Sequence, residues 1–185
     1  MRHVRILCLA LLAGIATGAA AQSNDADQPI HIQANAATLD DRQNTAVYTG
    51  NVIITQGSMR LTGSRVTQTL DNAGEVQKLV SNGSPATFRQ TPAGGNQVDA
   101  RALTIEYHAD TERVVLIKNA FLEQSGNTFQ GQLITYDIQR QVVDAGRAAT
   151  GEDTGDSAER IEIIIQPRTR TEPEGNVEND TNDET

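Results

Sequence analysis

The stretch VYTGNVIITQ, residues 47–56, decides the fold because the chain repeats its pattern 68 positions later as VLIKNAFLEQ, residues 115–124. Polarity and strand phase stay in register on both sides of this pair without a gap. The aligned pairs are Leu39 with Tyr107, Val47 with Val115, Asn51 with Asn119, Ile54 with Leu122, Gln56 with Gln124, Leu61 with Phe129, Gly63 with Gly131, Val66 with Ile134 and Thr67 with Thr135. Chance rarely preserves glycine, polarity and phase together over about forty positions, so we interpret the pattern as an internal duplication.

The amino end has the features of a secretory signal peptide. Arg2 and Arg5 precede an apolar run at residues 6–15, and alanines occupy residues 19–21. We expect cleavage after Ala21 and a flexible polar leader at residues 22–28. The only cysteine lies inside the signal, so the exported chain should form no disulfide.

Composition and patterning predict an all-β domain. The chain has no Trp, three Phe and three Tyr, and no window places apolar residues at helical spacing over three turns. Val, Ile and Thr instead recur in short runs between turn residues. The expected strands are residues 29–33, 36–40, 47–56, 59–70, 75–81, 86–90, 98–108, 113–124, 128–138, 141–145 and 160–166, with a turn at 82–85. Leu103, Ile105 and Tyr107 should share one face, and Gly63 should mark a bend or bulge.

Charge and motifs exclude several functions. The net charge is −9, and residues 151–185 hold eleven Asp and Glu against three Arg, so we expect a disordered acidic tail at residues 168–185. This charge and the export signal disfavour nucleic-acid binding. His31 and His108 have no second His or Cys at ligand spacing, and no nucleophile or phosphate-loop motif is present. We therefore expect no enzyme, no metal and no cofactor.

The repeated strand carries apolar residues in both strand phases, which leaves two architectures open. One is a sandwich whose inner faces fill each other. The other is an open or grooved β-roll that holds an apolar ligand, favoured because bulky core residues are scarce. A non-catalytic periplasmic chaperone or scaffold that acts through open β-edges would have the same composition, so that function stays open as an alternative.

Four segments resemble the LptA family of periplasmic lipopolysaccharide transport proteins, the OstA-like group. They are DQPIHIQ at 27–33, YTGNVIITQG at 48–57, PATFRQ at 85–90 and VVLIKNAFLEQ at 114–124. Lys118 departs from the glycine usual in that family. The resemblance implies a twisted open β-jellyroll at residues 29–167, without enzymatic activity. It also implies a periplasmic carrier that shields lipid A acyl chains in an apolar groove and passes lipopolysaccharide from the inner to the outer membrane.

The resemblance and the open edges together nominate site residues. Groove lining is expected at Ile30, Ile32, Phe88, Tyr107 and Leu116, with plain core packing as the alternative for each. Unpaired edges are expected to form the assembly interface at Ile30, His31, Ile32 and Gln33 in the first strand and at Ile161, Ile163 and Ile165 in the last. The implied partners are lipopolysaccharide, further copies joined head to tail, an inner-membrane LptC-type protein at the amino-terminal edge and an outer-membrane LptD-type protein at the carboxy-terminal edge.

Overall fold

The computed structural model describes residues 25–146 and 160–167, so the expected signal peptide and acidic tail lie outside it. The described elements are a 3-10 helix η1 (Asp25–Asp27) and strands β1 (Ile30–Gln33), β2 (Ala36–Asp40), β3 (Thr45–Gln56), β4 (Met59–Leu70), β5 (Val76–Gln90), β6 (Val98–His108), β7 (Arg113–Gln124), β8 (Asn127–Asp137), β9 (Val142–Ala145) and β10 (Glu162–Ile164). The predicted all-β class is confirmed. No helix in these ranges is long and apolar enough to cross a membrane.

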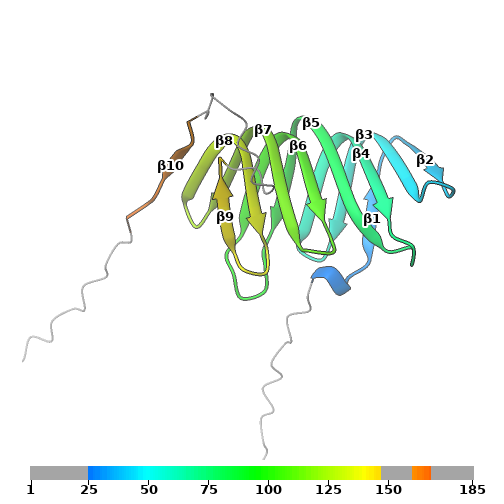
Figure 1. The fold of residues 1–185 in the computed structure, drawn as a ribbon, viewed down its shortest axis with the longest axis horizontal. Coiled ribbons are helices and arrows are strands. Elements are labelled where there is room, and N and C mark those ends of the chain that lie inside the picture. The colour runs from blue at the N-terminus through cyan, green and yellow to red at the C-terminus, as the bar shows by residue number, and fades with distance from the viewer. Residues whose placement is uncertain (1–24, 147–159, 168–185) are drawn as a thin grey trace, which may run out of the picture.

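The strands form one antiparallel sheet that folds over on itself. Hydrogen bonding follows the order β1-β3-β4-β5-β6-β7-β8-β10, with β2 also paired to β3 and β9 to β8. Each long strand curves over along one side of the molecule, as Figure 1 shows, and the ladders shift register at these bends. The two halves of each strand thus become two facing layers with apolar side chains between them. Both outer edges of the roll remain unpaired in the described residues.

The internal duplication is confirmed by the backbone. The bounds of β3 and β7 differ by 68 residues at both ends, and so do their register shifts. At both bends two consecutive residues adopt positive φ. These are Gly50 (79°) and Asn51 (45°) in β3, and Lys118 (63°) and Asn119 (52°) in β7. Lys118 therefore holds a backbone conformation in which the first copy uses glycine.

Gly63 meets the expectation of a bend. It pairs with Val52 directly beside the shift in the β3 ladder, and a Cβ on Gly63 would come within 2.3 Å of Ser81 Oγ and 2.7 Å of the Asn82 carbonyl. No side chain fits there without moving the β5 backbone, so glycine is required by the close approach of the two strands.

Two expectations about the bends were wrong. Residues 82–85 do not turn the chain, since β5 continues through them, with the register shift between Asn82 and Ala86. Glycine and proline there bend a strand that keeps pairing on both sides. Leu103 does not share the face of Tyr107. It is 37% exposed while Ala102 is buried, because the inward phase of β6 changes at the bend: Ala100 and Ala102 face inward on one side of it, and Ile105 and Tyr107 on the other.

The first and last strands are each split in two at the level of the bends. β1 and β2 pair with β3 as the two halves of β6 pair with β7, and 68 residues separate the equivalent positions. β9 and β10 pair with the two halves of β8 as β5 pairs with β4. The strand expected at residues 160–166 is shorter in the structure, where β10 contains three residues.

Candidate functional site

The interior between the two layers is the main apolar feature of the protein. Twenty buried residues form one cluster, in which Phe88 and Tyr107 stack with ring centroids 6.5 Å apart. No Asp, Glu, Lys or Arg in the described ranges is buried. The interior is therefore suited to hydrocarbon and excludes ions.

All five residues predicted to line the groove face this interior. Phe88, Tyr107 and Leu116 are 1%, 4% and 0% exposed, respectively. Ile30 and Ile32 are half-buried and pack against the same cluster from the edge strand. The structure thus brings the five together, while whether they contact lipid or only pack the core stays a prediction.

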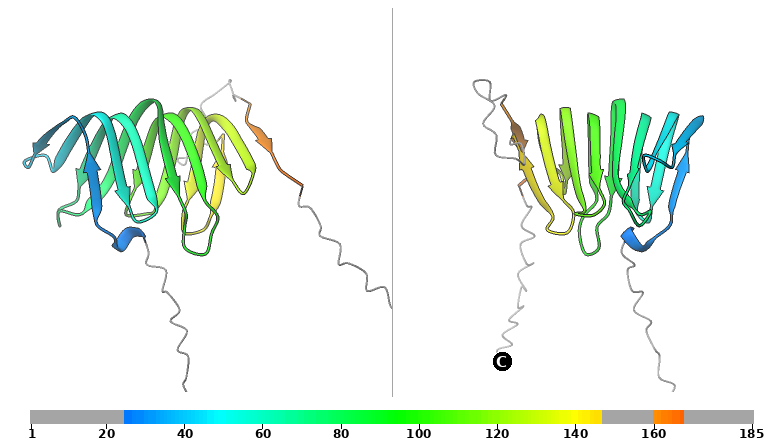
Figure 2. Two further views of the ribbon diagram at one scale, coloured as in Figure 1. Left: turned by 180° about the vertical axis from the view of Figure 1, so that it is seen from behind. Right: turned by 45° about the vertical axis from the view of Figure 1, so that its right-hand side comes forward.

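The interior is filled by its own side chains and closed along one side. We call the side opposite the bends the mouth, because the hairpin turns of the two layers face each other there. Both views in Figure 2 place η1 on this side. The loop between β5 and β6 also reaches the other layer, where a Cβ on Gly95 would come within 2.5 Å of Gln141 Nε2. A long-chain ligand that enters from this side needs the layers to separate at the mouth.

Burial disfavours ionisation of the tyrosines inside the roll, so their hydroxyl groups are uncharged at neutral pH. Burial raises the pKa of Tyr107 to about 12, and the negative charges of Glu112 and Asp25 add to the shift. Burial also raises the pKa of Tyr48 and of Tyr136. The Tyr48 hydroxyl donates a hydrogen bond of 2.8 Å to Gln68 Oε1, so this inner polar atom is satisfied.

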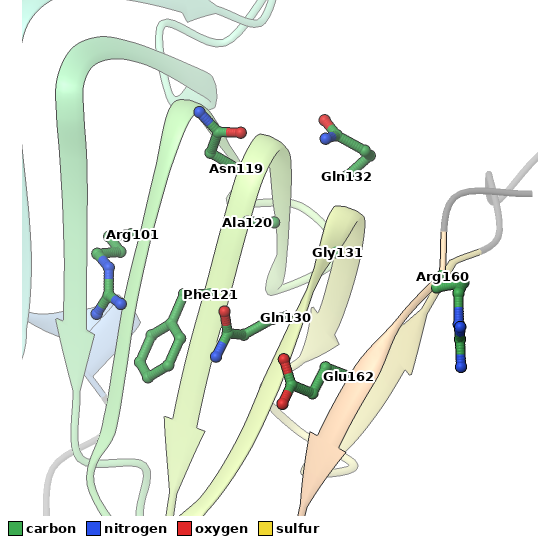
Figure 3. Close-up of a pocket in the computed structure, with 9 residues that line it drawn as sticks. All are labelled: Arg101, Asn119, Ala120, Phe121, Gln130, Gly131, Gln132, Arg160 and Glu162. Carbon is green, nitrogen blue, oxygen red and sulfur yellow. The ribbon is translucent and has the colours of Figure 1, made fainter.

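The outer surface of the described residues carries polar hollows. One hollow of about 540 Å³ lies over β6, β7, β8 and β10, where Arg101, Phe121, Gln130 and Glu162 project outward (Figure 3). Arg101 covers the Phe121 ring, with its guanidinium carbon 3.7 Å from the ring centroid. No group of three His, Cys, Asp or Glu able to hold a metal occurs within residues 25–146 and 160–167.

Exposed apolar side chains gather at the two edges of the sheet. Seven large hydrophobic residues of the described ranges are exposed, and all but Leu103 lie in β2, in β9 or in residues 160–167. The six are Leu39 (67%), Val142 (45%), Ile161 (42%), Ile163 (45%), Ile164 (44%) and Ile165 (73%). The predicted interface residues of β1 lie on the opposite edge from these isoleucines.

Two features of the mouth were missed from the sequence. Gln56 and Gln90 are buried at the C-terminal ends of β3 and β5, and the side chains of both hydrogen-bond the segment at residues 25–28. A glutamine in the inward phase at the end of an apolar strand was a usable signal, since Gln56 and Gln124 align in the duplication. The polar composition of residues 25–28 gave no sign that they contact the interior.

The sequence is similar to known lipopolysaccharide transport proteins. Residues 31–142 match the family described as LptA/(LptD N-terminal domain) LPS transport protein. The lipopolysaccharide export system protein LptH of Pseudomonas aeruginosa is 45% identical over 176 residues, covering 93% of this chain and 100% of that protein. The lipopolysaccharide export system protein LptA of Escherichia coli K12 is 32% identical over 163 residues, covering 88% of this chain and 83% of that protein.

A solved structure agrees with the fold. The crystal structure of LptH, described as the LptA homologous periplasmic component of the lipopolysaccharide transport device of Pseudomonas aeruginosa, superposes with a TM-score of 0.69. The sequence identity is 46%, and the match covers 78% of this chain and 100% of that one.

Proposed function

Since this chain belongs to the family of LptA and LptD N-terminal domain lipopolysaccharide transport proteins, we propose that it is a periplasmic carrier of lipopolysaccharide. The observation that carries the proposal is the uncharged apolar interior of the roll, which is continuous from β3 to β8. The interior would hold the acyl chains while the sugars stay in water. The protein would need no catalytic group for this role.

The physical reason for such a carrier is the cost of exposing acyl chains. A chain with about a dozen CH₂ groups loses roughly 10 kcal/mol when it passes from hydrocarbon to water, at about 0.8 kcal/mol for each group. A path lined by apolar side chains removes most of this cost. Because the protein is acidic overall, affinity for an anionic glycolipid has to come mainly from the acyl chains.

Entry of an acyl chain from the side of the hairpin turns requires the layers to move apart at the mouth. The layers are continuous through the bends, and in the described residues no strand ladder joins them at the mouth. Opening there would break side-chain contacts and leave the sheet ladders intact. This geometry supports a roll whose two layers separate at the mouth while the bends act as the hinge. The inward side chains would then contact the ligand, including Ile32, Phe88, Tyr107 and Leu116.

We further propose that copies of the chain join head to tail through their two unlike edges. The junction between β5 and β6, where the first repeat meets the second, supplies a template for this contact. β9 and β10 occupy the place of β5, and β1 and β2 occupy the place of β6. The edge at β9 and β10 is thus prepared to accept β2 and β1 of another copy by antiparallel strand addition.

The template also gives the register of the joint. The equivalences pair Val143 with Leu39 as Leu79 pairs with Tyr107, Ile163 with Ile32 as Phe88 pairs with Ala100, and Ile165 with Ile30 as Gln90 pairs with Val98. These positions belong to the inward phase, so the contact would bury the exposed Leu39 and Ile165 and join two interiors. The two surfaces differ, so the contact propagates as an open filament.

By the same reasoning the free edges at the ends of a filament are the sites for unlike partners. The edge at β1 and β2 would take an inner-membrane LptC-type protein, and the edge at β9 and β10 would take an outer-membrane LptD-type protein. The family resemblance supports this orientation, and the unpaired strands supply the backbone donors and acceptors that it requires.

A binding experiment with two forms of one ligand tests the proposed function. The purified protein should bind lipopolysaccharide and should lose at least tenfold in affinity for the same molecule after chemical removal of its acyl chains. Equal affinity for both forms would place recognition on the sugars and refute the carrier. Absence of binding to either form, together with binding to unfolded or partner proteins, would favour the scaffold that acts through open β-edges.

A further inference from the structure

Three glutamines form a row on the inner rim of the mouth. Gln56, Gln90 and Gln124 are the last residues of β3, β5 and β7. Each follows an inward apolar residue by two positions, so each faces the interior. Their strands alternate with β4 and β6 in the sheet, which spaces the glutamines about 10 Å apart at roughly 4.8 Å for each strand. We call Gln56, Gln90 and Gln124 the glutamine rim.

Residues 25–28 cover two members of the rim and offer them acceptors. Gln56 Nε2 donates to the carbonyl oxygens of Ala26 (3.0 Å) and Gln28 (3.1 Å). Gln90 Nε2 donates to the Asp25 carboxylate at 2.8 Å. We call residues 25–28 the cover, since they lie across the mouth at this point.

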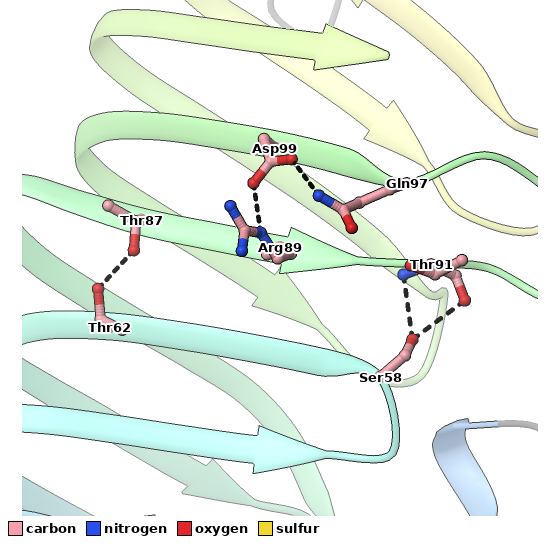
Figure 4. A network of polar contacts seen from close by, with 7 residues as sticks. All are labelled: Ser58, Thr62, Thr87, Arg89, Thr91, Gln97 and Asp99. Atoms are coloured by element: carbon pink, nitrogen blue, oxygen red, sulfur yellow. Dashed lines mark hydrogen bonds and ion pairs between the residues drawn. The ribbon is translucent and has the colours of Figure 1, made fainter. Parts of the chain in front are cut away.

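The Asp25 carboxylate ties the cover to Ser58, in the turn between β3 and β4. Ser58 donates its backbone N–H to Asp25 Oδ1 at 2.8 Å, and its hydroxyl hydrogen-bonds the other carboxylate oxygen. Figure 4 shows that the same hydroxyl also accepts from the Thr91 N–H at 3.0 Å. The cover is therefore fixed through Asp25 and the two glutamines, with few apolar contacts, because Ala26 and Asp27 are exposed.

The rim is incompletely satisfied in this state. Gln90 is 5% exposed, and its Oε1 is buried without a hydrogen-bond partner in the described residues. Among the residues that the structure describes, the partner of Gln124 Nε2 is the Tyr136 hydroxyl, at the long distance of 3.4 Å. An unsatisfied buried amide oxygen is destabilising, and the cover cannot satisfy it with carbonyl and carboxylate oxygens alone, because these are acceptors. A partner for Gln90 Oε1 has to bring an N–H or O–H donor.

We propose that the glutamine rim binds the acylated sugar of the carried glycolipid and that the cover stands in for it until the ligand arrives. The proposal rests on the carrier function proposed above. When acyl chains fill the interior, the first polar atoms at the mouth are the amide and ester groups that link each chain to the sugar. Their carbonyls accept from glutamine Nε2, as the carbonyls of Ala26 and Gln28 now do, and an amide N–H or a sugar hydroxyl donates to Gln90 Oε1.

The space beside the cover fits this assignment. A hollow of about 550 Å³ is lined by both the cover and the interior, through Gln28, Ile30, Gln56 and Tyr107. Four carboxylates, those of Asp27, Asp71, Glu75 and Asp110, also line it, so the uncharged sugar and not a phosphate would occupy it. The ligand would then exchange one set of hydrogen bonds for another, and the rim would set how deep the chains enter.

The test uses two probes and a background in which the cover is loosened. The probes are lipid A, which has an acylated sugar, and a fluorescent fatty acid, which has none. Asp25→Ala removes the carboxylate that holds the cover and should strengthen lipid A binding at least threefold. In that background, Gln56→Met with Gln90→Met should weaken lipid A binding at least tenfold and change fatty-acid binding less than threefold.

The control variant is Gln68→Met. Gln68 is also buried and inward-facing, but it accepts from Tyr48 and contacts no part of the cover. It should leave the ratio of the two affinities unchanged, and thermal unfolding of each variant reports whether the fold survives. If the rim variants weaken both probes equally, the glutamines are structural and the inference fails while the carrier stands. If the unmodified protein binds no lipid A, both fail.

Discussion

The joint between copies gives the sharpest quantitative prediction, because the structure supplies the exposed area that it would bury. Leu39 is 67% exposed and Ile165 is 73% exposed, whereas the positions that they match at the β5–β6 junction, Tyr107 and Gln90, are 4% and 5% exposed. Complete burial of such a side chain contributes about 1.5–3 kcal/mol. Each residue should therefore contribute roughly 1–2 kcal/mol to the joint, or about 2–4 kcal/mol together.

The perturbation is Leu39→Ser with Ile165→Ser in one chain. A loss of about 2–4 kcal/mol lowers the association constant roughly 30- to 700-fold at 1.4 kcal/mol for each factor of ten. Sedimentation velocity or light scattering over a concentration series measures this shift directly. Each single variant should lie between the unmodified protein and the double variant, since each residue contributes to every joint once.

The matched control is Leu103→Ser, which removes an exposed leucine from a bend instead of an edge. It should leave association unchanged. A chain that ends before Arg160 should also fail to associate while it stays folded. Unchanged association in the double variant, or an equal loss in the control, would refute the edge-to-edge joint.

Three further predictions concern the bends, the tyrosines and export. Lys118→Gly should stabilise the fold by about 0.5–1 kcal/mol, because Lys118 has a positive φ of 63°. Gly50→Lys should destabilise it by about 1–3 kcal/mol, because Gly50 has φ of 79° and a Cβ there would come within 2.6 Å of Asn35 Nδ2. Shifts of the urea unfolding midpoint in the opposite directions would contradict the duplicated bend. The Tyr107 pKa of about 12, against 10.0 when unfolded, means that the folded state retains the tyrosine proton longer, so stability should fall by about 2–3 kcal/mol between pH 10 and pH 12. Tyr107→Phe should remove that part of the fall in alkaline unfolding curves. Mass spectrometry of the exported protein should give a chain that begins at Gln22, and a chain that keeps Met1 or carries lipid on Cys8 would show another processing route.

The sequence predicted the sheet because its strands alternate and its repeat is regular. The 68-residue offset located β3 and β7 together, and the inward phase placed Ile32, Phe88 and Leu116 in the interior. These are local properties of a strand with one face on a core. They can be predicted from neighbouring residues in the sequence, without knowledge of contacts between distant parts of the chain.

The bends were harder to predict than the strands, because the same residue types occur in bends within a strand and in turns between strands. Gly83 and Pro85 are typical of a chain reversal, and only pairing on both sides of β5 distinguishes the bend. The phase of Leu103 failed for the same reason, since no residue type marks the position in β6 at which the inward phase changes. The cover was missed because its contacts with Gln56 and Gln90 join parts of the chain 28 to 65 positions apart.

The central claim is that the inner face of the roll contacts the acyl chains, and site-specific photo-crosslinking to lipopolysaccharide tests it most directly. A photo-reactive residue at Ile32 or Phe88 faces the interior, whereas one at His31 or Glu106 is a single step out of phase and faces water. Ile32 is half-buried on an edge strand, so the substitution there should not prevent folding. We predict strong crosslinks at Ile32 and Phe88 and none at His31 or Glu106, and equal crosslinking in both phases would contradict the account.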